Sequence, residues 1–99
     1  MLFDPKWEVR VCEPWRLRYL QAAENIERRG WCQGRLEDEE GRVCLVQAMR
    51  MTAMTDSEGL RLCAYLRVKA LELPKWNDAP GRTKEQVVAA LRACANRVP

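Results

Sequence analysis

The 99-residue chain contains no histidine, the side chain that most often acts as a general base or a zinc ligand. It also has no glycine-rich loop of the kind that binds phosphates. Asp78 or Glu13 could act as a base and Cys32 as a nucleophile, but no base lies near Cys32 in the sequence. We therefore expect a protein that is not an enzyme and holds no cofactor.

Long apolar runs are also missing, since no stretch approaches the roughly 18 to 20 residues that a transmembrane helix needs. Asp4 and Glu8 interrupt the N-terminal region where a signal peptide would be apolar. The composition, 47% hydrophobic and 31% charged, is that of a globular protein. We expect one helical domain over residues 1–99, with residues 1–12 as an extended N-terminal arm, in a cytoplasmic protein without a membrane partner.

The five cysteines are an odd number without a secretory signal, and no two of them form a close pair. Disulfide frameworks need an oxidising compartment, and zinc sites usually use paired thiolates or imidazoles. We therefore predict reduced thiols that pack as small hydrophobic residues, and no metal site. The cysteines are Cys12, Cys32, Cys44, Cys63 and Cys94.

Apolar residues recur at helical spacing along most of the chain, which predicts an all-α fold, a compact bundle of about four helices. Pro14 and Gly30 suit the start and the end of the first helix. Thr55 with Glu58, and Thr83 with Gln86, have the spacing of capping boxes. The predicted helices cover residues 14–29, 44–54, 56–72 and 83–97.

The third predicted helix has apolar residues around most of its circumference, so it is expected to lie in the centre of the core. Its expected core residues are Leu60, Cys63, Ala64, Leu66, Val68 and Leu71. Pro74 is expected to stop it, because proline lacks the amide donor that a helix interior needs. Met49, Met51 and Met54, in the helix before it, are interpreted as core residues rather than as a methionine-rich docking groove.

Two connections can be interpreted from their turn residues. Residues 35–43 form either a plain loop or a minor β-hairpin, and the four acids from Glu37 to Glu40 are expected to be a solvated turn. Pro80 and Gly81 suit the two central positions of a type II turn.

The stretches "RRGWCQG", "GRVCLVQAM" and "WNDAPGRTKEQVVAALRACA" resemble a family of small uncharacterised proteins from actinomycetes and their bacteriophages, a domain of unknown function. The resemblance covers about Leu17 to Ala95. Its most specific part is the Trp-Asn-Asp-x-Pro-Gly-Arg-Thr motif at residues 76–83. The resemblance implies a phage-encoded, α-helical cytosolic protein without a known cofactor, and it implies no activity.

Two tryptophans stand next to amide or carboxylate groups in predicted connections, and an up-and-down bundle places its first and third connections at the same end. One interpretation is that each ring packs over the edge of the core while Asn77 and Asp78 cap backbone amides. The other is a protein-recognition surface, because tryptophan and arginine anchor many interfaces. The candidate surface consists of Trp31, Gln33, Trp76, Asn77, Asp78 and Arg82.

The net charge of +3 is unevenly distributed, since residues 1–59 carry 9 basic and 11 acidic side chains and residues 60–99 carry 8 and 3. The second half therefore allows an alternative function as a weakly basic nucleic-acid-binding protein, with Lys75, Lys84 and Arg92 as phosphate contacts. We expect instead a protein-binding module, a phage factor that engages or inhibits a host protein. The sequence does not define its oligomeric state.

Overall fold

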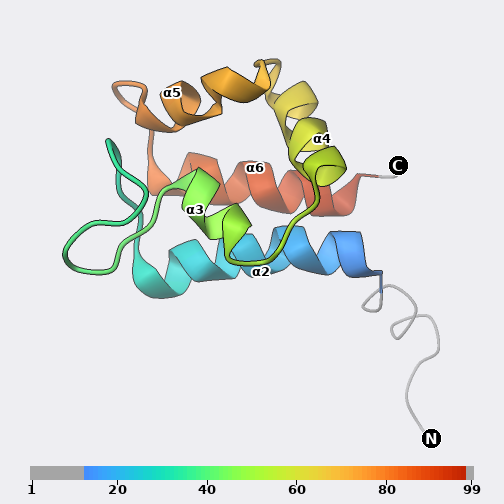
Figure 1. The fold of residues 1–99 in the computed structure, drawn as a ribbon, viewed down its shortest axis with the longest axis horizontal. Coiled ribbons are helices and arrows are strands. Elements are labelled where there is room, and N and C mark those ends of the chain that lie inside the picture. Colours follow the sequence, from blue (N-terminus) through green and yellow to red (C-terminus); the bar gives the residue numbers. More distant parts are fainter. Residues whose placement is uncertain (1–12, 98–99) are drawn as a thin grey trace, which may run out of the picture.

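The computed structural model describes residues 13–97, and this part of the chain is an all-α bundle, as predicted (Figure 1). It contains no strand, only isolated β-bridges from Val43 to Trp31 and to Glu37. The expected extended arm, residues 1–12, lies outside the described residues. The helices are α2 (Pro14–Arg29), α3 (Leu45–Arg50), α4 (Asp56–Leu66), the 3-10 helix η1 (Ala70–Glu72), α5 (Leu73–Asp78) and α6 (Lys84–Asn96).

The two longest helices, α2 and α6, lie side by side and run in opposite directions; α3 packs against α2, α4 against α6, and α5 against α3 (Figure 1). The face of α2 that meets α6 contains Ala22 and Ala23, whose small side chains allow the backbones to approach closely. Ile26 and Leu91 are completely buried in the core. This pair of helices is the base on which the shorter elements are held.

Helix ends follow the predicted signals closely. Pro14 opens α2, and Gly30 ends it with a φ of 91°, a left-handed value that glycine adopts without strain. A Cβ atom at Gly30 would come within 2.7 Å of the Arg42 Cγ atom, so this position has no room for a side chain. Both capping boxes are present, Thr55 with Glu58 and Thr83 with Gln86.

The predicted third helix is wrong in its second half. Helix α4 ends at Leu66, because Arg67 adopts a left-handed conformation with a φ of 61°. Pro74 does not stop a helix but stands in the first turn of α5, where a residue without an amide donor is tolerated. Trp76 and Asp78 therefore belong to a short helix and not to a loop.

Part of the core that the sequence predicted for residues 60–71 is exposed in the structure. Cys63 lies in the core and Leu66 and Val68 pack against it, as predicted. Leu60 is 56% exposed and Leu71 92% exposed, and Ala64 is also exposed, so these three predicted core residues are wrong. Of the three methionines, Met49 is buried and Met54 half-buried, whereas Met51 is exposed.

The segment between α2 and α3 is a loop without a strand pair. The Asp38 amide donates to the Arg42 carbonyl and the Gly41 amide to the Asp38 carbonyl, which closes a turn. Glu37, Glu39 and Glu40 are exposed, as expected of a solvated turn. Asp38 is the exception, because its carboxylate accepts hydrogen bonds from the Arg42 side chain and from two backbone amides within the loop.

Candidate functional site

The side chain of Asn77 connects three segments that are distant in the sequence. Its Oδ1 atom accepts hydrogen bonds from Trp31 Nε1, at 2.7 Å, and from the Leu45 amide, at 3.0 Å. Its Nδ2 atom donates to the Cys32 carbonyl, at 3.2 Å. Asn77 is only 1% exposed, so these hydrogen bonds are shielded from water. The predicted closeness of the two tryptophan segments is therefore real, and Asn77 joins them.

Gln33 and Asp78 add further contacts between the same two segments. Gln33 Nε2 donates to the carbonyls of Asn77 and Ala79, at 3.1 and 3.2 Å. The Asp78 carboxylate accepts from the Gly34 amide, at 2.9 Å. Asp78 thus caps a backbone amide, as the capping interpretation expected, although this amide belongs to the segment after α2 and not to the turn next to Asp78.

Trp76 and Arg82 form a second pair beside this network. The Arg82 guanidinium carbon lies 3.9 Å from the centroid of the Trp76 ring, a cation–π contact, and Arg82 Nε donates to the Trp76 carbonyl at 2.9 Å. The type II turn at Pro80 and Gly81 is closed by a hydrogen bond from the Arg82 amide to the Ala79 carbonyl. This turn reverses the chain and so brings Arg82 back toward Trp76. All six candidate residues are therefore gathered together, and their polar side-chain atoms bond to one another and to nearby backbone groups.

Replacing Asp78 with alanine is expected to lower the free energy of unfolding by about 1 kcal/mol, because the Gly34 amide loses its acceptor. Urea denaturation measures this change. Glu39→Ala is the matched control, since Glu39 is exposed and has no hydrogen bond or ion pair with another described residue. If the two variants have the same stability, the structural role of Asp78 is disproved.

The residues of the nucleic-acid alternative do not share one unpaired face. Lys84 and Arg92 both approach the carboxylate of Glu27, at 3.1 and 3.5 Å, so their charges are partly neutralised. Lys75 is exposed on α5, a different helix. The attraction of this region for phosphates is reduced by Glu27, and the nucleic-acid alternative stays a prediction.

The three residues that sequence reasoning considered for catalysis have other partners. Burial raises the pKa of the Cys32 thiol, which leaves little thiolate at neutral pH. Glu13 pairs with Arg16, and Asp78 accepts from Gly34. The other described cysteines, Cys44, Cys63 and Cys94, are buried as expected. Among the described side chains, no group of three or more cysteines or acids is arranged to hold a metal ion.

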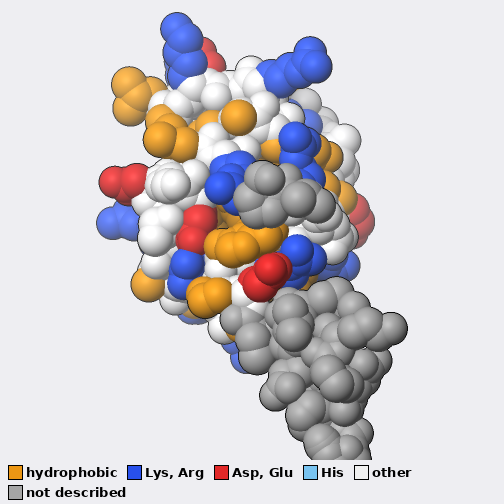
Figure 2. Space-filling view, turned by 90° about the vertical axis from the view of Figure 1, so that its right-hand side faces the viewer, with side chains coloured by type: hydrophobic (Ala, Val, Ile, Leu, Met, Phe, Trp, Pro, Cys, Tyr) orange, Lys and Arg blue, Asp and Glu red, His pale blue; other side chains and the backbone are white. Residues whose placement is uncertain are grey.

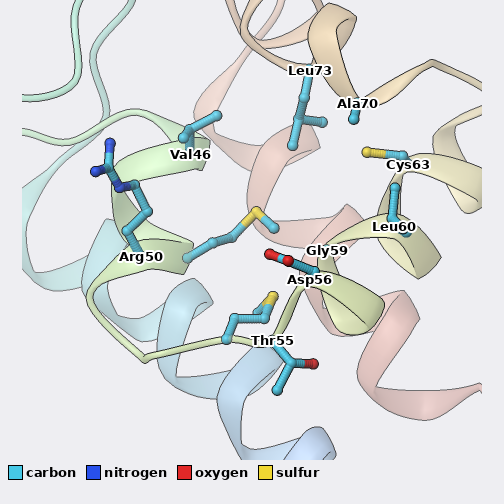
Figure 3. Close-up of a pocket in the computed structure, with 11 residues that line it drawn as sticks. Val46, Arg50, Thr55, Asp56, Gly59, Leu60, Cys63, Ala70 and Leu73 are labelled. Atoms are coloured by element: carbon cyan, nitrogen blue, oxygen red, sulfur yellow. The ribbon is translucent and has the colours of Figure 1, made fainter.

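An apolar groove between α3, α4 and η1 is the feature that the sequence did not reveal. It has a volume of about 380 Å³. In Figure 3, Val46 and Arg50 stand on the α3 side, Leu60 and Cys63 on the α4 side, and Ala70 and Leu73 at one end. Figure 2 shows that the end of the molecule near α4 also has hydrophobic side chains at its surface between basic and acidic ones. The apolar residues that line the groove are Val46, Met49, Met54, Leu60, Cys63, Ala70 and Leu73.

Two signals in the sequence could have indicated this groove. One is the excess of apolar residues between 56 and 72, which fits one buried helix but also fits a helix with an exposed apolar face. The other is the methionine cluster, because Met49 and Met54 line the groove and methionine is common at adaptable binding surfaces.

Together the fold and the groove define a small all-α bundle with an open apolar surface. The helices within residues 13–97 all fall short, in length or in hydropathy, of what a membrane crossing requires. The model of a family of unknown function, DUF6197, matches residues 18–97, and the chain belongs to this family. No curated protein and no solved structure matches the chain. The resemblance to a family of unknown function is thus confirmed.

Proposed function

We propose that the protein is a small protein-binding module and that the apolar groove is its contact surface. The observation that carries this proposal is the apolar groove together with Leu60, which lines it and is 56% exposed. Burying a leucine side chain contributes about 1.5–3 kcal/mol, so covering Leu60 would favour association. Contiguous apolar surface of this kind is typical of interaction sites.

The groove is a better candidate than the end that contains the two tryptophans. There, the Asn77 side chain is buried, and Gln33 and Asp78 bond within the chain. Trp31 and Trp76 pack against the core, and the Arg82 guanidinium already covers the Trp76 ring. A partner at this end would have to compete with those contacts, so the recognition surface expected from the sequence stays a prediction.

The biological setting that we propose is the cytoplasm of a bacterium, with the module encoded by a phage. Support for this setting comes from the resemblance to proteins of actinomycetes and their phages. In that setting a host protein and a second copy of the chain are the two kinds of occupant that could compete for the groove.

A photo-crosslinking amino acid at position 60 is expected to give a discrete protein adduct in cells, because Leu60 lines the groove. The same amino acid at position 36 is the control, since Leu36 is 44% exposed but lies outside the groove. Gel analysis and mass spectrometry identify the adducts.

The proposal fails if position 60 gives no adduct, or if both positions give the same adducts. An adduct that nuclease removes would instead support the nucleic-acid alternative. Substitution at Leu60 is expected to change stability little, because this side chain is largely exposed.

A further inference from the structure

The groove carries one charge of each sign, on opposite walls. Arg50 belongs to α3 and Asp56 to the first turn of α4, and both line the groove (Figure 3). Each is exposed, and neither forms an ion pair with another residue in the described part of the chain. The rim of the groove therefore has no net charge, but its charges are separated, with the positive one on the α3 wall and the negative one on the α4 wall.

We propose that the occupant of the groove is a second copy of this chain, related by a two-fold axis that passes through the groove. This inference rests on the proposed function, since it names the partner of the same surface. A two-fold axis that runs along the groove, parallel to its walls, exchanges the two walls, so α3 of each copy faces α4 of the other. Each Arg50 then lies opposite Asp56 of the partner subunit, and the contact occurs twice.

Charge favours a second copy over a partner whose contact surface carries charges of one sign. A basic partner would leave Arg50 opposed by a like charge, and an acidic partner would do the same to Asp56. A second copy supplies the opposite charge to both. The chain as a whole carries a net charge of +3, which makes two copies repel, but the neutral groove rim is a place where they can approach without that penalty.

Shape favours the same occupant. The groove is a hollow, and Leu60 projects from its α4 wall with more than half of its surface exposed. In the two-fold arrangement, Leu60 of each copy covers the apolar α3 wall of the other, formed by Val46 and Met49. An interface between identical surfaces must contain both a projection and a hollow, and this surface has both.

Sedimentation velocity on the full chain over a range of concentrations tests the proposal. The wild-type chain is expected to form dimers. Arg50→Glu and Asp56→Arg are each expected to raise the dimer dissociation constant by about tenfold or more, because each creates two like-charge contacts. Circular dichroism checks that both variants keep their helices.

Mixing the two variants gives the sharpest result. In a mixed dimer, the glutamate introduced in one variant would face the arginine introduced in the other. The unchanged Arg50 and Asp56 would also face each other, so both ion pairs return. The 1:1 mixture is therefore expected to form dimers at concentrations where each variant alone is a monomer.

The double variant Arg50→Glu with Asp56→Arg is expected to form dimers by itself, because both charges of each ion pair are exchanged. Arg28→Glu and Glu39→Arg change exposed charges outside the groove, and these controls should leave dimerisation unchanged.

A wild-type chain that is monomeric at all concentrations would overturn the proposal, as would dimers that the charge changes do not affect. The crosslinking experiment at position 60 distinguishes failure of the second-copy proposal from failure of the protein-binding function. A monomeric chain that still gives an adduct with another protein at position 60 would retain the protein-binding function and reject the second copy. A monomeric chain without that adduct would reject both.

Discussion

Replacing Asn77 with alanine is expected to lower the free energy of unfolding by about 3 kcal/mol, the largest single effect that the structure predicts. The change leaves the Trp31 indole, the Leu45 amide and the Cys32 carbonyl without their partner. Each unsatisfied buried polar group costs about 1–3 kcal/mol, and Asn77 is almost completely buried. Urea denaturation followed by circular dichroism measures the loss.

Asn96→Ala is the matched control for this measurement, because Asn96 is an exposed asparagine at the end of α6. It is expected to change stability by less than about 0.5 kcal/mol. If Asn77→Ala is as stable as the control, Asn77 does not hold the two segments together. The tryptophan end would then be free to serve as the recognition surface that the sequence suggested.

The ion pair between Arg18 and Glu58 makes stability depend on pH. Arg18 Nε donates to the Glu58 carboxylate at 2.7 Å, and this contact, more than the opposing effect of burial, lowers the pKa of Glu58. A lowered folded-state pKa means that the ionised carboxylate stabilises the fold above the pKa of the unfolded chain. That contribution is lost as the pH falls through the lower, folded-state pKa.

Glu58→Gln is therefore expected to lower the free energy of unfolding by about 2 kcal/mol at pH 7, through the weakened ion pair and capping box. The difference from wild type should shrink as the pH falls below 4.5, the ordinary pKa of the group, because Glu58 itself becomes neutral. Denaturation at a series of pH values between about 7 and about 2.5 measures this convergence.

Glu24→Gln removes the same charge from an exposed position of α2 that has no ion pair with another described residue. Its difference from wild type should stay small at every pH. A Glu58→Gln difference that stays constant down to about pH 2.5 would show that the carboxylate charge does not contribute, and that only the shape of the side chain matters.

The elements that the sequence predicted well are those whose ends are marked by local chemistry. Helix α2 begins at Pro14 and ends before Gly30, and α6 begins at the capping box of Thr83 and Gln86. In each case the residue type satisfies a backbone group or sets a dihedral angle by itself. No tertiary contact is needed to interpret such a signal, so a single sequence is enough.

The break between α4 and α5 lacked such a signal. Arg67 adopts a left-handed conformation that arginine does not prefer, and only the packing of the surrounding chain explains it. Pro74 fits either the end of one helix or the start of another, and the sequence alone favoured the first. Missing this break placed Leu71 in the core, and taking the whole helix as central did the same for Leu60, which lies on the exposed side of α4. Both errors concealed the groove.

The candidate site shows the same division. The closeness of Trp31 and Asn77 agrees with the geometry of an up-and-down bundle, although Asn77 lies in α5 and not in the connection that this geometry assumed. The hydrogen-bond partners of the polar side chains could not be predicted from the sequence. Whether an amide faces water or a buried indole depends on three-dimensional distances that a sequence pattern does not contain. The groove depends on where three short elements come to rest, and α3 and η1 are too short to have a clear periodicity.

The late position of Asn77 in the chain determines when the N-terminal half can finish folding during synthesis. Asn77 lies 46 positions after Trp31 and 32 positions after Leu45, the two donors that it accepts from. Contacts of such long separation form slowly, because the intervening chain must first be ordered. While the ribosome is still adding α5, the segment after α2 and the start of α3 lack their shared acceptor. We infer that α2 and α3 acquire their final connection only after α5, which ends at Asp78, has emerged.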